Sequence, residues 1–155
     1  MEKLKNEIIG DKSVMAIEYM VTQKKPYIMG NLILWMNDIY IGAFEDEQML
    51  LNIAHIFESL PTNISDNDTF NDLSRDEIYH FLNEENEGHL VNLGEGFDDF
   101  LIYAYVTGDQ LNFIWNLLDE PFFTYPSYPN GLQFAKISKN FLIDVVEQFK
   151  ANLLN

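Results

Sequence analysis

The chain has 155 residues, of which 47% are hydrophobic and 14% aromatic. This is enough for one folded domain with a core, and it excludes a disordered tail. Twenty-five Asp and Glu against nine Lys and Arg give a net charge of −16, which excludes a general nucleic-acid binder or a protein drawn to anionic lipid. Residues 26–135 hold 19 acidic side chains and one basic side chain, Arg75, for a net charge of −18. The electrostatic field of this negative charge attracts a basic partner.

The sequence lacks the usual marks of export, membrane insertion and thiol chemistry. It contains no apolar run of about 18 residues, and no apolar stretch of a signal peptide follows the charged start at 1–7. The absence of cysteine excludes disulfides, thiolate zinc sites and cysteine nucleophiles. We therefore expect a cytoplasmic protein that holds neither a metal nor a cofactor.

In chain order, the first predicted elements are strands. Residues 13–23 alternate between apolar and polar side chains, which predicts a half-buried strand. Residues 27–37 are apolar on both sides, which is typical of a central strand. Asn and Asp at 37–38 tolerate positive φ angles, so we expect a tight turn there into a third strand at 39–44.

Two helices should follow. Residues 45–60 have an acidic start and an apolar stripe at helical spacing, and we expect Pro61 to end this helix. After a polar loop, Ser74 and Glu77 fit a capping box at the start of a short helix through Asn83.

The second half of the chain returns to strands before a final helix. An acidic, glycine-containing connection at 83–99 comes first. Ser138 fits the N-cap of the last helix, whose apolar stripe contains Leu142, Val145, Val146 and Phe149. The strands expected before it are 100–107, 111–118 and 132–137, with a proline-containing loop at 121–131.

This order of elements predicts a single α+β domain over residues 1–155. Runs of strands and runs of helices are segregated along the chain, which favours a largely antiparallel sheet and argues against a doubly wound one. We expect five or six strands with two or three helices packed on the sheet. The sequence shows no linker, internal repeat or low-complexity block.

No assembled active site is visible in the sequence. None of His55, His80 and His89 has a second histidine at metal-pair spacing, and neither a phosphate-binding loop nor a nucleophile elbow occurs. The segment from Asp66 to Glu77 has acidic residues at positions 1, 3 and 12 of a calcium loop. It lacks the oxygen ligand and the glycine needed at positions 5 and 6, so a loop leading into a capped helix is the simpler interpretation.

The acidic connection at 83–99 is the strongest candidate for a binding surface, since loops on a rigid scaffold often carry binding residues. Like charges brought together destabilise a fold, which suggests that the excess charge serves a partner. Acidic side chains and two tyrosines of the proline loop, as aromatic anchors, form the predicted contact set. Its members are Glu84, Glu85, Glu87, Glu95, Asp98, Asp99, Asp66, Asp68, Asp72, Tyr125 and Tyr128.

The N-terminal third resembles a known group of proteins. The matching segments are Ile8-Ile9-Gly10-Asp11, Met15-Ala16-Ile17-Glu18, Gly30-Asn31-Leu32-Ile33-Leu34-Trp35 and Ile39-Tyr40-Ile41-Gly42. They look like the opening strands of bacterial polymorphic-toxin immunity proteins, in particular the family of immunity protein 42. The resemblance covers residues 8–60, with weaker support from 97–118, and nothing from Pro121 onward contributes to it. It implies a small cytoplasmic α+β protein that neutralises a toxin domain, often a nuclease, delivered by a neighbouring cell.

The predicted function is therefore inhibition of a cognate toxin, bound one to one, through the acidic surface. Two alternatives stay open at this point. One is a nucleic-acid mimic that inhibits a DNA-binding protein, which also requires a basic partner. The other is a metal-dependent or carboxylate-based hydrolase, for which the sequence lacks the expected histidines and motifs.

Overall fold

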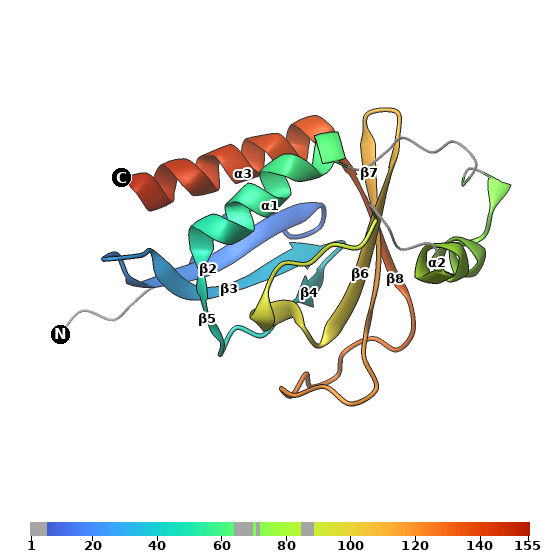
Figure 1. Cartoon of the computed structure of the whole chain (residues 1–155), viewed down its shortest axis with the longest axis horizontal. Coiled ribbons are helices and arrows are strands. Elements are labelled where there is room, and N and C mark those ends of the chain that lie inside the picture. Colours follow the sequence, from blue (N-terminus) through green and yellow to red (C-terminus); the bar gives the residue numbers. More distant parts are fainter. Residues whose placement is uncertain (1–5, 64–69, 71, 85–88) are drawn as a thin grey trace.

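The structure is a computed structural model that describes residues 6–63, 70, 72–84 and 89–155 (Figure 1). Within these residues, eight strands and three α-helices alternate in groups along the chain. In chain order, the elements are β1 (Glu7–Asp11), β2 (Met15–Gln23), β3 (Met29–Met36), β4 (Ile39–Ile41), β5 (Glu47–Met49), α1 (Leu50–Asn63), α2 (Arg75–Glu84), the short 3-10 helix η2 (Glu95–Phe97), β6 (Phe100–Thr107), β7 (Gln110–Leu117), β8 (Gln133–Ser138) and α3 (Lys139–Leu154).

The described strands form two antiparallel sheets. The first has the order β1-β2-β3-β4, with β5 pairing with another part of β3, and the second has the order β6-β7-β8. The α+β class and the antiparallel pairing are confirmed. The strands are divided between two sheets, and the described segments α1, α2 and η2 separate the two sets along the chain.

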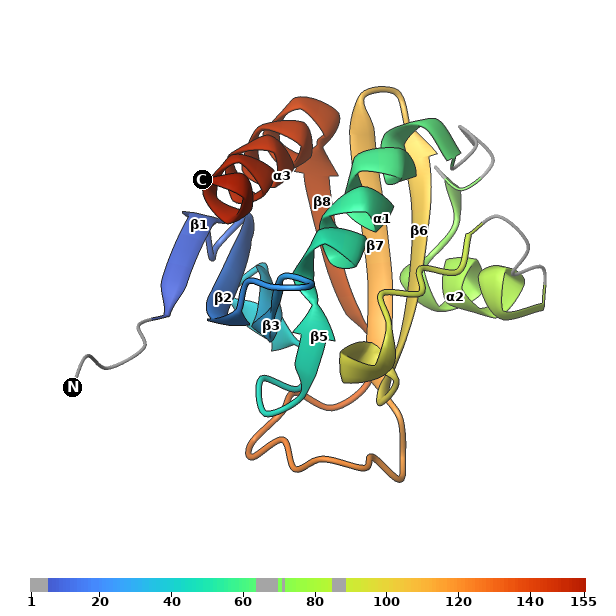
Figure 2. The same ribbon diagram turned by 60° about the vertical axis from the view of Figure 1, so that its left-hand side comes forward.

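The main core lies between the two sheets and the two longer helices. Helices α1 and α3 run side by side along one face of the first sheet (Figures 1 and 2). Alternate residues of β7, such as Phe113 and Trp115, enter this core, while Ile114 faces the other way toward α2. The predicted strand at 111–118 is therefore confirmed, and both faces of the second sheet are covered.

The predicted start of the first helix was wrong. Residues Glu47–Met49 form strand β5, in which Gln48 lies opposite Gly30 of β3, and the helix begins at Leu50. The acidic residues at 45–47 favour a helix start, but they do not show that a strand edge of β3 lies nearby. Pairing with β3 determines the conformation of Glu47–Met49.

The predicted end of this helix was also wrong, because α1 continues to Asn63 with Pro61 inside it. Pro61 lacks the backbone donor that would reach the carbonyl oxygen of Phe57, and it lies only two residues before the end of the helix, so the helix loses this bond near its end. The hydroxyls of Ser59 and Thr62 donate hydrogen bonds to the backbone oxygens of Ile56 and Ser59, at 2.8 and 3.1 Å.

Several local predictions are confirmed. Asn37 and Asp38 have φ angles of 54° and 62°, as the predicted tight turn requires. The Ser138 hydroxyl caps α3 by accepting a hydrogen bond from the backbone N–H of Phe141 at 3.1 Å. None of the described helices has both the length and the apolar character needed to cross a membrane.

Candidate partner-binding surface

Acidic side chains line two neighbouring cavities at one end of the molecule. The first cavity, of about 360 Å³, is lined by Asp46, Glu95, Asp98, Asp99, Phe122 and Phe123. The second, of about 390 Å³, is lined by Met29, Glu47, Gln48, Met49, Asn52, Ile53, Leu93, Gly94 and Glu95. Because Glu95 lines both, we refer to the two cavities together as the acidic groove.

Contacts between distant segments create this groove. The backbone N–H of Ala43 donates to the carbonyl oxygen of Gly96 at 2.8 Å, which places the turn before β5 beside η2. The ring of Phe97 packs directly against Gly42, at a position where a Cβ atom would lie only 2.8 Å from the ring, and Gly42 has a φ angle of 113°. Glycine is therefore required there for both space and backbone conformation.

Gln48 connects the strand and η2 inside the second cavity. Gln48 is only 7% exposed, and its Nε2 atom has no hydrogen-bond partner among the described residues. A Cβ atom on Gly96 would lie 2.2 Å from this nitrogen, so the amide is packed on the backbone of η2. An unpaired buried donor of this kind is unusual and unfavourable in a folded protein.

Asp99 fixes the loop that forms the other wall of the groove. Its carboxylate accepts hydrogen bonds from the backbone N–H groups of Phe122 and Phe123, at 2.7 and 3.0 Å, and from the Tyr125 hydroxyl at 2.8 Å. Burial by itself would raise the pKa of Asp99, but these hydrogen bonds favour the charged form more strongly and lower the pKa below its ordinary value. We refer to this set of hydrogen bonds as the Asp99 clamp.

The two tyrosines of the predicted contact set are packed inside the molecule. Tyr125 is 9% exposed and stacks on Tyr40, while the Tyr128 hydroxyl donates to the Tyr40 carbonyl oxygen at 2.7 Å and accepts from Trp115 Nε1 at 2.9 Å. Burial, together with the Asp99 carboxylate, raises the pKa of Tyr125, so its hydroxyl stays protonated as a donor. These tyrosines attach the loop to both sheets.

Phe122, which the sequence prediction did not include, lies on the surface of the same loop. Its side chain is 87% exposed, whereas the neighbouring Phe123 is only partly exposed and packs against the main core. The two rings are 5.0 Å apart in an edge-on arrangement. Two adjacent phenylalanines cannot be told apart by residue type, so only the structure shows which one faces solvent.

The predicted contact residues are therefore divided among several places. The structure brings together Glu95, Asp98 and Asp99, with Asp99 buried and the other two exposed. Exposed Glu84 is in α2 and lies 3.1 Å from His80 Nε2, and exposed Asp72 lies just before α2. Asp66, Asp68, Glu85 and Glu87 lie outside the described residues.

The capping interpretation of the segment before α2 is confirmed. The backbone N–H of Glu77 donates to the Ser74 hydroxyl at 3.2 Å, and the N–H of Ser74 donates to the Glu77 carboxylate at 3.1 Å.

Within the described part of the chain, no cluster of three or more His, Asp or Glu side chains has a spacing that could hold a metal. His89 is engaged with the backbone, since its Nδ1 lies 3.0 Å from the Ala104 carbonyl oxygen.

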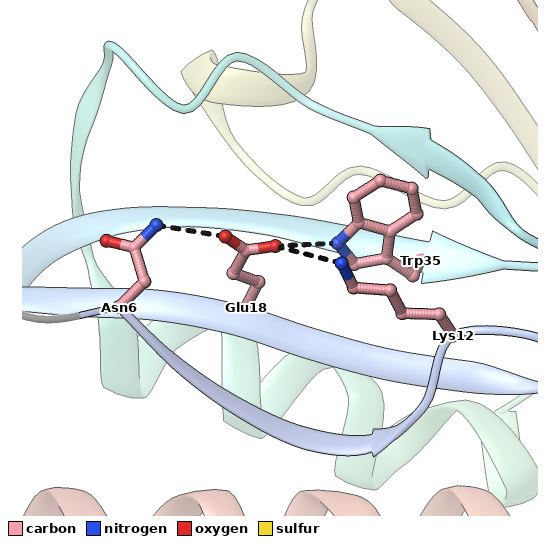
Figure 3. A network of polar contacts seen from close by, with 4 residues as sticks. All are labelled: Asn6, Lys12, Glu18 and Trp35. Atoms are coloured by element: carbon pink, nitrogen blue, oxygen red, sulfur yellow. Dashed lines mark hydrogen bonds and ion pairs between the residues drawn. The ribbon is translucent and has the colours of Figure 1, made fainter.

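A second acidic position lies on the outer face of the first sheet and has partners of its own (Figure 3). Glu18 of β2 accepts hydrogen bonds from Trp35 Nε1 and Asn6 Nδ2, both at 2.9 Å. Lys12 Nζ lies 3.9 Å from the same carboxylate and 4.2 Å from the centre of the Trp35 ring. We refer to these four residues as the Glu18 network.

Comparisons with known proteins identify both a family and a fold. The family described as immunity protein 42 matches residues 8–152. The crystal structure of CdiI from Burkholderia dolosa AUO158 is similar with a TM-score of 0.64 at 13% sequence identity, over 94% of this chain and 99% of that one. At this identity the likeness is one of fold. No curated protein matches the chain.

Proposed function

The chain belongs to the immunity protein 42 family, and from this premise we propose that it neutralises a nuclease toxin domain by binding it one to one through an acidic surface. The family match covers nearly the whole chain and extends well beyond the N-terminal third on which the resemblance rests. In this proposal the protein acts in the cytoplasm as an inhibitor that blocks the toxin by occupancy and carries out no chemistry.

The observation that carries the proposal is the localised excess of negative charge. Residues 26–135 hold a net charge of −18 around a single arginine. A nuclease must attract phosphate, so its cleft tends to be basic, and carboxylates can occupy the positions where phosphates would bind. Complementary charge speeds the encounter of the two proteins and disfavours wrong partners.

The role of Arg75 supports this view of the charge. Its guanidinium group lies 4.4 Å from the centre of the Phe134 ring in β8, on the outer face of the second sheet. It therefore contributes to the packing of α2 and does not line either cavity of the acidic groove. The negative surface is thus available to a partner of opposite charge.

The test uses the C-terminal domain encoded by the gene immediately upstream, because immunity genes lie directly downstream of their toxin genes. We expect this domain to degrade nucleic acid and to stop growth when expressed alone, and co-expression of the chain to restore both. Calorimetry should give one chain per toxin domain, with affinity falling as salt concentration rises. Reversal of Glu84, Glu85 and Glu87 to Lys should weaken binding and reduce its dependence on salt, because it removes acidic residues of the predicted contact set.

An upstream domain that this chain neither binds nor neutralises would overturn the proposal. Binding that is equally tight at low and high salt would contradict the acidic surface while leaving the immunity function intact. A toxin domain that kills without cleaving nucleic acid would contradict only the nuclease assignment.

A further inference from the structure

We propose that the acidic groove, with Phe122 at its edge, is the surface that holds the toxin, and that its occupant is a basic segment of the toxin domain. This inference rests on the proposed function. It narrows the binding surface from the acidic part of the molecule as a whole to the acidic groove. The groove lies at the end of the molecule where η2 and the loop between β7 and β8 meet, and both views place α3 at the opposite side (Figures 1 and 2).

In the described part of the chain, the charges in the groove have no ion-pair partner. Asp46, Glu47, Glu95 and Asp98 line its two cavities, and among the described residues none of them forms an ion pair. Of the residues that the structure describes, no lysine or arginine lines either cavity. A lysine or arginine side chain of the partner would therefore meet carboxylates that the fold does not use.

Gln48 gives an independent reason to expect a ligand in the second cavity. Gln48 is more than nine-tenths buried, its Nε2 donor is unpaired among the described residues, and the residue lines the cavity. Once the amide turns from the backbone of η2 toward the cavity, a backbone carbonyl oxygen of the basic segment can supply the missing acceptor. The same cavity has apolar walls from Met29, Ile53 and Leu93, which suit the aliphatic stem of an incoming lysine or arginine.

Phe122 provides an apolar anchor next to the charges. A phenylalanine exposed to this degree gains from burial in a partner, and large aromatic side chains dominate the energetics of interfaces. The Asp99 clamp holds the backbone of Phe122 and Phe123 in place before the partner arrives. Binding then requires little further ordering of the loop, which favours affinity.

The experiment measures binding of the purified upstream toxin domain to single variants of the full chain. Phe122→Ala should raise Kd about 30-fold, as expected of a large aromatic anchor that becomes buried in the interface. Asp98→Lys and Glu95→Lys should each raise Kd about 100-fold, because each places a cation where the partner carries one. The fold of each variant is checked by its Tm, which should stay near that of the wild type since these side chains are exposed.

Two matched controls lie on α3, away from the groove. Glu147→Lys makes the same change of charge at an exposed position, and Leu154→Ala removes an exposed apolar side chain. Each should change Kd by no more than about twofold, the size of a long-range effect on the encounter.

The outcomes separate this inference from the proposed function. If the wild type binds the toxin domain and the groove variants bind as tightly as the α3 controls, the groove is the wrong surface and the immunity function stands. If the wild type itself fails to bind, the proposed function fails and this inference fails with it. Binding lost in groove variants that keep their Tm supports the inference.

Discussion

The Glu18 network and the acidic groove show two different uses of carboxylates on one acidic protein. Glu18 is only 16% exposed at its side chain and is surrounded by an indole N–H, an amide and a lysine (Figure 3). Asp46, Glu95 and Asp98 gather in the groove without an ion pair among the described residues. The Glu18 carboxylate has partners within the chain and contributes to the stability of the fold. The groove carboxylates are available to another molecule.

The same chemical change, from carboxylate to amide, can test this difference at three places. An amide keeps nearly the same shape while it removes the charge and replaces one acceptor with a donor. Its effect therefore reports how far each carboxylate is used within the folded chain.

The largest effect is expected at Asp99. Asp99→Asn should lower the free energy of unfolding by about 3 kcal/mol, because the new NH₂ group cannot accept a hydrogen bond, so at least one donor of the Asp99 clamp loses its acceptor. Urea denaturation followed by tryptophan fluorescence measures this change. A loss below about 0.5 kcal/mol, the usual range for surface substitutions, would show that the loop is held by its aromatic packing instead.

The pH dependence supplies the control for Asp99. Its pKa is lower in the folded protein than in the unfolded chain, so its contribution is fully present above the ordinary aspartate pKa of about 3.9 and is lost as the pH falls through the folded pKa. The difference in stability between wild type and Asp99→Asn should therefore shrink as the pH is lowered from 6 toward about 3. A difference that does not change with pH would contradict a charged Asp99 clamp.

An intermediate effect is expected in the Glu18 network. Glu18→Gln should lower the free energy of unfolding by about 1 kcal/mol, because Trp35 and Asn6 keep at most one good acceptor and lose its charge. The same denaturation measurement applies, and Trp35 fluorescence should shift as its indole N–H loses a charged partner. If the free energy of unfolding stays unchanged, Glu18 contributes no more to stability than the carboxylates of the groove do.

The smallest effect on stability is expected in the groove. The triple variant Asp46→Asn, Glu95→Gln and Asp98→Asn should change the free energy of unfolding by no more than about 0.5 kcal/mol, with any change toward greater stability because like charges are removed. Its toxin affinity should fall in the binding assay. A strongly destabilised triple variant would mean that these carboxylates have partners inside the chain, and the contrast with Glu18 would disappear.

Local signals in the sequence predicted the parts of the fold that depend on near neighbours. The capping box at Ser74 and Glu77 and the turn at Asn37 and Asp38 each need only residues a few positions apart, and both are confirmed. Strand β5 was missed because its conformation depends on pairing with β3, some 18 positions earlier in the register.

The same limit applies to the candidate surface. Charge counting placed Glu95 and Asp98 in the contact set, and these two do lie together in the groove. It could not separate them from Asp99, whose partners are backbone groups 23 and 24 residues away. It also passed over Asp46, which the contact between Ala43 and Gly96 brings to the groove, and the exposed ring of Phe122.

Asp99 fixes the backbone of its loop, and this does not depend on which side chain stands at the exposed position 122. The carboxylate accepts hydrogen bonds from the backbone N–H groups at 122 and 123. Every residue except proline provides such a group. The side chain at 122 can therefore be exchanged without a change in the course of the chain. In the binding mode proposed above, substitution at this one position would alter the contact with the toxin while the scaffold stays the same.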